Sequence, residues 1–384
     1  MPSLSTHRQS SCLGIYGFIS ALVIGLALAT QGRADTVAGA VLTTEVDNVL
    51  SGGLDVGSRS LSNLDLTAHW TGDNGWEAFG YILGDFGGPF SGSHAGDIQT
   101  TSNIDSIEGW RLFETYGKKT FRKDSYVMAG LINLNGIFDV QTVGGLFLNA
   151  SHGIGVDYSQ IGLSIFPTSG LGIVGQWRFD DRNSFRAGVF DAVPGNPNDD
   201  KAFAYIRLSR REGSHIVGEY QYDFEGGYLK LATWHNSAAA ERLDGSGWSD
   251  SNSGAYAQLA VTLTGDDTRG LKGWLRTGVA NAQVMTIDQY AGGGLVYTAP
   301  FKGRDTDQVG FAIAAAHFGK PYQTSIGDTL QREITYELTY RWDIRDGLSI
   351  QPDLQYISHP YGRSDIDDAT VFNLRLKTDL MALR

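Results

Sequence analysis

The sequence predicts an all-β fold: one transmembrane antiparallel up-and-down β-barrel of about 16 strands, with short periplasmic turns and long extracellular loops. Three observations support this prediction. Segments with one apolar and one polar face recur along the chain, an apolar leader precedes them, and no later run of about 18 apolar residues could form a spanning helix. The 50 glycines and the 11% of aromatic residues suit many strands joined by tight turns.

Residues 1–34 have the features of a secretory signal peptide. His7 and Arg8 form a short basic region, Leu13–Ala29 is apolar, and Gly32-Arg33-Ala34 is a small-x-small cleavage site. Cleavage near Ala34 would leave a single barrel domain over residues 35–384. An uncleaved membrane anchor is the alternative, because the apolar run is nearly long enough to span a bilayer.

The strand-like segments are mostly about 9–12 residues long, which is the length that a tilted strand needs to cross a bilayer. The predicted strands are Val41–Leu50, Ser60–Thr71, Gly75–Phe86, Glu108–Lys118, Asp124–Leu134, Gly170–Phe179, Ser184–Ala192, Ser214–Tyr222, Gly226–His235, Gly254–Thr264, Gly270–Asn281, Gln289–Thr298, Asp307–Phe318, Glu333–Ile344, Leu348–Ile357 and Thr370–Asp379. Their even number is typical of an outer-membrane barrel.

The connections between these segments alternate between brief and long. The brief ones are Thr71–Gly75, Asp180–Asn183, Gly265–Arg269 and Arg345–Gly347. The longer ones are Gly87–Ile107, Asn135–Ser169, Pro194–Gly213, Asn236–Ser253 and Pro300–Thr306. This alternation indicates periplasmic turns on one side and extracellular loops on the other.

The clearest hairpin is Gln331–Ile357. In its first strand the apolar positions are Ile334, Tyr336, Leu338, Tyr340 and Trp342, and the polar positions are Glu333, Thr335, Glu337, Thr339 and Arg341. This spacing has the period of two residues that a strand requires. Asp346-Gly347 supplies the turn, because glycine adopts the positive φ that a tight hairpin needs. The polar face would line a water-filled lumen, and the apolar face would contact lipid.

Large aromatic residues on the apolar faces often fall near strand ends, as at Trp70, Tyr340, Trp342 and Tyr356. This placement indicates an interfacial girdle. Scattered aromatic residues in the core of a soluble barrel remain the alternative.

Several motifs, taken in order, resemble the OprB family of carbohydrate-selective porins. They are Asp47-Asn48 with Gly52-Gly53, Arg111–Glu114, Phe147–Ser151, Gly226–Trp234, Gly292–Gly294, Gly303–Asp307, and Glu333, Glu337 and Tyr340 beside Leu348–Tyr356 (LSIQPDLQY). The resemblance implies a Gram-negative outer-membrane porin that passes carbohydrates, chiefly monosaccharides such as glucose, down their gradient. It also implies small sugars, outer-membrane lipid, lipopolysaccharide and the barrel-assembly machinery as partners, and leaves open a homotrimer or a monomer.

Side chains that strand parity directs inward are the candidates for lining the channel and contacting sugar. We nominate Arg178, Arg186, Glu219, Lys230, Trp234, Trp274, Arg276, Glu333, Glu337, Arg341 and Asp353, with Asp65, His69 and Arg375 as further lining positions. Charged groups offer paired donors and acceptors to sugar hydroxyls, and aromatic faces suit the C–H side of a pyranose ring. The alternative is that most of these residues form structural ion pairs between strands.

The segment 135–169 is the candidate constriction loop. It is long and carries apolar residues unusual for a solvated loop, among them Phe138 and Phe147, together with the polar Asp139 and Asn149. A loop that packs over the barrel rim is the alternative.

Composition argues against several other functions. The formal charge of −12 is unsuited to nucleic-acid binding. The only cysteine, Cys12, falls in the leader, so we expect no disulfides and no thiolate chemistry in the exported chain. The eight histidines lack the spacing of metal ligands, and no nucleophile or phosphate-loop motif is present. We therefore expect neither an enzyme nor a cofactor. A general diffusion porin and a non-transporting carbohydrate-binding β-protein remain as alternatives.

Overall fold

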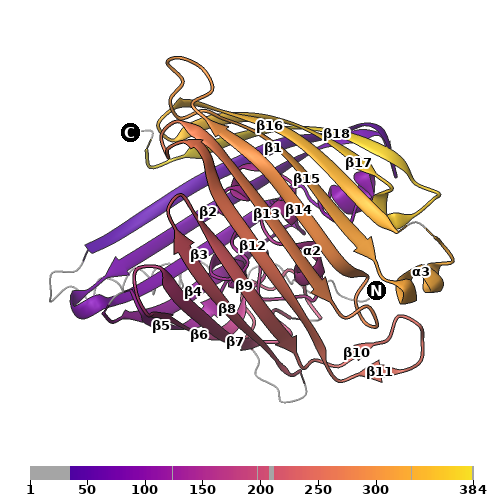
Figure 1. Ribbon diagram of the computed structural model, residues 1–384, viewed down its shortest axis with the longest axis horizontal. Helices are drawn as coiled ribbons and strands as arrows, with labels where there is room; N and C mark the ends of the chain where they lie inside the picture. Colours follow the sequence, from indigo (N-terminus) through magenta and orange to yellow (C-terminus); the bar gives the residue numbers. More distant parts are fainter. Residues whose placement is uncertain (1–34, 123, 197, 207–211, 330, 383–384) are drawn as a thin grey trace, which may run out of the picture.

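The computed structural model describes residues 35–122, 124–196, 198–206, 212–329 and 331–382, and it shows a closed barrel of tilted strands (Figure 1). The predicted signal peptide, residues 1–34, lies outside the described residues. Sixteen strands of the described chain close the barrel, and each is hydrogen-bonded to two antiparallel neighbours, with β1 also pairing with β18. The predicted fold class is therefore confirmed.

The barrel strands are β1 Asp35–Gly53, β2 Gly57–Thr71, β3 Trp76–Phe86, β4 Gly109–Thr120, β5 Tyr126–Ile132, β6 Gly170–Arg178, β7 Asn183–Asp191, β8 Ser214–Phe224, β9 Gly227–Asn236, β12 Asn252–Gly265, β13 Gly270–Ala280, β14 Ile287–Thr298, β15 Gln308–Phe318, β16 Arg332–Arg345, β17 Leu348–Ser358 and β18 Asp367–Asp379. A small separate sheet pairs β10 Ala240–Glu241 with β11 Trp248–Ser249. The helices that matter below are η2 Ser91–Ala95, η5 Ala150–His152, α2 Val156–Ser159 and α3 Lys320–Ile326. Within the described ranges, no helix has the length and apolar character needed to cross a membrane.

The two faces of the strands meet different surroundings, as their alternation predicts. Leu275 and Leu338 point outward and keep 61% and 52% of their surface exposed. Glu333 and Glu337 point inward and are 0% exposed. An apolar exterior with a polar interior is the arrangement of a membrane barrel and the inverse of a soluble one.

The hairpin of β16 and β17 follows the prediction closely. Arg345 pairs with Leu348, which leaves Asp346 and Gly347 as the turn. Gly347 has φ of +73°, a conformation that glycine adopts without steric cost.

The two ends of the barrel differ in their connections. The end that carries Asp346-Gly347 also holds the connections 72–75, 121–125, 179–182, 225–226, 266–269 and 299–307. The opposite end holds 54–56, 87–108, 133–169, 192–213, 237–251, 281–286, 319–331 and 359–366.

Two connections depart from the predicted alternation. Pro300–Thr306 was expected among the long loops, but it lies at the short-turn end, because Gly270 pairs with Thr298 and so brings β14 to that end. The connection 54–56 departs in the opposite way, because it is short but lies at the long-loop end. The strands β1 and β2 extend to Gly53 and Gly57 and leave only three residues at the long-loop end.

Two of the long connections turn into the barrel. In the segment 87–108, Phe90 and Ala95 pack against Val49, Leu61 and Ile357 on the inner wall. In the segment 133–169, Phe138 and Tyr158 pack against side chains such as Trp234. We call these segments the first insert (87–108) and the second insert (133–169).

Candidate channel interior

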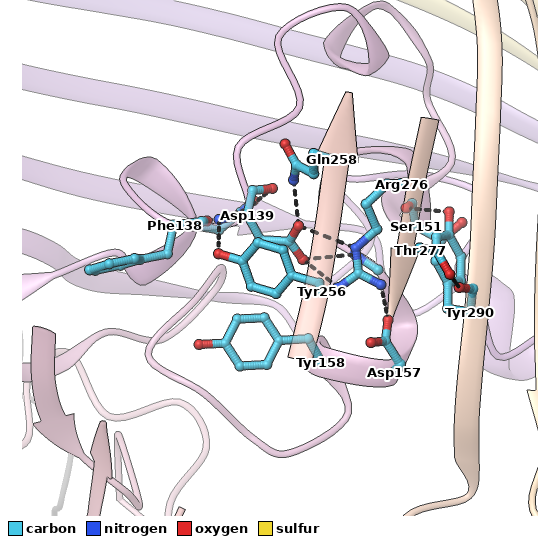
Figure 2. Close-up of polar contacts among 12 residues, drawn as sticks. Phe138, Asp139, Ser151, Asp157, Tyr158, Tyr256, Gln258, Arg276, Thr277 and Tyr290 are labelled. Atoms are coloured by element: carbon cyan, nitrogen blue, oxygen red, sulfur yellow. Dashed lines mark hydrogen bonds and ion pairs between the residues drawn. The ribbon is translucent and has the colours of Figure 1, made fainter. Parts of the chain in front are cut away.

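An ionic cluster joins the second insert to the barrel wall (Figure 2). Strand parity directs Arg276 of β13 inward, where its Nη2 donates to Oδ2 of Asp139 at 2.8 Å and its Nη1 contacts Oδ1 of Asp157 in α2. All three side chains are buried. Away from water such charges are costly unless they are paired, so the two carboxylates and the guanidinium depend on one another.

Neighbouring side chains complete this cluster. The guanidinium carbon of Arg276 lies 5.2 Å from the ring centroids of both Tyr256 and Tyr290. This is a cation–π arrangement, which is stronger when it is desolvated. Burial raises the pKa of Asp157 to about 6, although the charge of Arg276 opposes the shift.

A second polar contact lies on β7–β9. The Nη1 of Arg186 donates to Oε1 of Glu219 at 2.8 Å, and Oε2 of Glu219 accepts from the backbone N–H of Asp139 at 3.1 Å. The ammonium of Lys230 donates to the carbonyl oxygen of Val140 at 2.7 Å. Three nominated residues are thus brought together, and they contact the second insert.

The nominated carboxylates of β16 are covered by the inserts. Glu337 accepts from the backbone N–H groups of Leu148 and Asn149, at 2.6 and 3.1 Å. Glu333 accepts from those of Ile98 and Gln99, at 2.9 and 3.1 Å. The two oxygens of one carboxyl group can accept from two successive backbone donors. These residues therefore hold loops in place and present no surface to a passing solute.

The third nominated carboxylate, Asp353 on β17, is also buried, and it accepts from the side chain of Gln355 at 2.9 Å. Asn149 of the second insert donates to the same Gln355 at 3.2 Å. The polar face of the QPDLQY strand thus lies beneath the second insert.

The nominated aromatic residues are also covered. Trp234 stacks on Tyr158 with ring centroids 5.3 Å apart. The ring centroid of Trp274 lies 6.4 Å from that of Phe147 and 5.5 Å from that of His152 in η5. Phe138 meets Phe190 edge to face at 6.2 Å. Burial lowers the pKa of His152 to about 3, so the ring is neutral at pH 7.

Two nominated arginines lie apart from this interior. Arg178 is 3.6 Å from Asp223, and Arg341 is 3.2 Å from Asp343. Both pairs are partly exposed at the short-turn end. Arg341 and Asp343 line a polar cavity there of about 550 Å³.

Inward-facing residues in the short-turn half of β2–β4 keep partial exposure, whereas Leu83, Asp85 and Arg111 in the long-loop half are buried. Asp65 accepts from the hydroxyl of Tyr81 at 2.5 Å, and His69 lies 3.1 Å from Glu77. Glu114 of β4 pairs in register with Tyr81 and is likewise half-buried. On β18, Arg375 contacts Glu45 and donates to Asn103 of the first insert at 2.7 Å.

The sequence analysis missed several of these residues. Tyr81, Glu114, Tyr256 and Gln258 share inward parity with the nominated set, so alternation could have found them. The first insert carries apolar residues in a long connection, which is the same signal that singled out 135–169. No pattern in the sequence marked Asp157 or Tyr158 as a residue of the channel interior. Within the described ranges, no group of three or more His, Cys, Asp or Glu side chains could hold a metal ion.

Comparisons with known proteins agree with this architecture. Residues 62–380 match the model of the carbohydrate-selective porin, OprB family. Porin B of Pseudomonas aeruginosa is 30% identical over 143 residues, a match that covers 32% of this chain and only 31% of that relative.

Solved structures show the same fold. The high-pH structure of Pseudomonas putida OprB superposes with a TM-score of 0.81 at 20% identity, covering 95% of this chain and 97% of that one. The outer membrane channel DcaP of Acinetobacter baumannii gives 0.56 at 9% identity, covering 91% of this chain and 98% of that one. Because the family model matches most of the barrel, the chain belongs to the OprB family of carbohydrate-selective porins, which are outer-membrane proteins.

Proposed function

We propose that this chain is a passive channel through which small sugars, monosaccharides such as glucose, cross the outer membrane into the periplasm. It would carry out no catalysis and need no cofactor. The exported chain would be one barrel domain over residues 35–384, with residues 1–34 removed as a leader. Membership of a carbohydrate-selective family supports the transport of sugars.

One observation supports the proposed route of the sugars: inward-facing side chains on different strands of the barrel differ in their exposure to solvent. Tyr256, Trp274 and Tyr290 are buried beneath the second insert, whereas Asp65 and Tyr81 on β2 and β3 remain half-buried. We therefore place the passage along the inner face of β2–β4 in their short-turn half, which we call the open side. The second insert narrows the lumen from the wall of β12–β14, and the first insert covers the long-loop half of β2 at Leu61.

The chemistry of the open side suits a neutral polyol. Asp65 and Glu114 supply acceptors for hydroxyl groups. Phe79 and Tyr116, whose rings lie 5.2 Å apart, supply apolar faces. Each contact is weak, so a sugar can be released as well as held, as conduction requires.

The nominated residues then fall into three roles. Arg178 and Arg341 would contact sugars at the periplasmic mouth. Arg186, Glu219, Lys230, Arg276, Glu333, Glu337 and Asp353 would fix the inserts, together with Trp234 and Trp274. The residues Phe138, Asp139, Phe147 and Asn149 of the second insert would contact the barrel wall and so set how far the insert narrows the lumen.

Planar-bilayer recording with added glucose tests the proposal. We expect open-channel current to fall saturably as glucose rises, and liposomes that contain the protein to swell in glucose. A channel that glucose does not block, in liposomes that swell equally with any solute of that size, would indicate the alternative, a general diffusion porin. Protein that forms no channel would leave a non-transporting carbohydrate-binding role.

A further inference from the structure

A band of small side chains crosses the outer face of four neighbouring strands. Ala257 of β12 pairs with Thr277 of β13, Thr277 with Ala291 of β14, and Ala291 with Ala315 of β15. All four point outward, because their sequence neighbours Gln258, Arg276 and Ala316 are buried inside the barrel. The wall is therefore thinner here than beside it.

Large apolar side chains border this band on its periplasmic side. The next row runs across β9 and β12–β15 and consists of the outward-facing residues Leu229, Leu259, Leu275, Gly293 and Ile313. These side chains and three members of the band line an open depression of about 540 Å³. The hydroxyl of Thr277 donates to the carbonyl oxygen of Tyr290 at 3.1 Å, so it presents no unsatisfied donor to a ligand.

Basic side chains lie at the border toward the long-loop end, together with one carboxylate, that of Asp288. His317 lies two residues beyond Ala315, or about 7 Å along the strand, and pairs in register with the exposed Arg332. His317 is 2.6 Å from Asp288. Lys320, also exposed, begins α3 just above. An apolar depression thus ends at basic groups where the wall leaves the membrane.

We propose that this depression binds one saturated acyl chain of lipopolysaccharide, with a headgroup phosphate against Arg332. The long-loop end of an outer-membrane barrel faces the cell exterior, so the depression extends from the middle of the wall, at Leu275 and Ile313, into the outer leaflet. A gap left between a rigid wall and its surroundings forfeits dispersion contacts, which a fitted chain restores. Basic groups at the membrane surface attract anionic headgroups.

Native mass spectrometry in detergent tests this site, with lipid A, phosphatidylglycerol and phosphatidylcholine titrated separately. The variant fills the band with Ala257→Leu and Ala291→Leu. The matched control is Ala129→Leu, an outward position on β5 that is exposed, as Ala291 is on β14. Heat-modifiable gel mobility shows that each barrel is folded, which separates a lost site from a lost fold.

We expect wild-type protein and the control to retain lipid A at least tenfold better than phosphatidylglycerol, and the double variant to lose this preference. Arg332→Gln should weaken lipid A binding several-fold and leave phosphatidylcholine unaffected. The proposal is overturned if the folded double variant retains lipid A as wild type does, or if phosphatidylglycerol binds equally well. A double variant that changes oligomeric state instead would show that a second copy occupies the depression.

Discussion

Two inner faces of this barrel have the same sequence pattern and opposite surroundings. On β12–β14 the inward residues Tyr256, Arg276 and Tyr290 are buried by the second insert. On β2 and β3, Asp65 and Tyr81 remain partly exposed. We call the first face the filled side and the second the open side. Alternation decides which way a side chain points, but the long connections decide whether it meets water.

The largest effect should come from detaching the second insert from the filled side. Arg276→Leu leaves Asp139 and Asp157 buried without their counter-charge, a loss that typically costs about 3–5 kcal/mol. We expect the insert to leave the wall, so that single-channel conductance rises and glucose selectivity falls.

Arg269→Leu is the control for this variant, because it removes an arginine whose ion pair with Asp305 is exposed at the short-turn end. It should change conductance far less. Unaltered conductance and glucose block in Arg276→Leu would contradict the anchoring role of the cluster.

A moderate effect should follow a change on the open side. Asp65→Asn replaces a charged acceptor by a neutral one, and hydrogen bonds to neutral groups are weaker by about 1 kcal/mol. We expect glucose block to weaken by about three- to tenfold with folding unchanged, measured by current against glucose concentration. Asp305→Asn, an exposed position in a turn, is the control. Equal glucose block in Asp65→Asn and wild type would show that sugars do not pass along the open side.

The smallest expected effect is a change in the stability of the seated insert at acid pH. The pKa of His152 is about 3 in the folded chain, below its usual 6.5, so the unfolded or detached state binds more protons between these values. His152 therefore favours the seated insert least at low pH, and this contribution is lost as pH falls from 6.5 toward 3. Asp157, with its pKa raised to about 6, acts in the opposite direction between pH 6 and 3.8.

The comparison between His152→Gln and wild type isolates the histidine, because Asp157 is common to both. We expect the variant to gain thermal stability relative to wild type as pH is lowered from 7 to 4. Parallel melting profiles over this range would show that His152 binds protons equally in both states, which would contradict its lowered pKa in the folded chain.

The filled and open sides show how much of the fold and of the channel interior could be predicted from the sequence. Alternation and glycine turn chemistry were enough to predict the strand number and the hairpin at Gly347. They could not show that Glu333 and Glu337 accept from backbone groups of segments about 190 to 235 residues away, since parity places a carboxylate on a face without telling what covers it. The first insert was predictable from its apolar residues. Pro300–Thr306 was misplaced because length alone does not tell which end a connection occupies.

The most direct test of the two-sided interior is cysteine accessibility, since the one native cysteine, Cys12, falls in the predicted leader. Thr67→Cys places a thiol on the open side, and Ala314→Cys places one at a fully buried inward position of β15, the strand next to the filled side. With a charged thiol reagent in the bilayer chamber, we predict that Thr67→Cys reacts, that its conductance drops and that glucose slows the reaction, whereas Ala314→Cys stays unmodified. Ala314→Cys reacting as fast as Thr67→Cys would contradict the account.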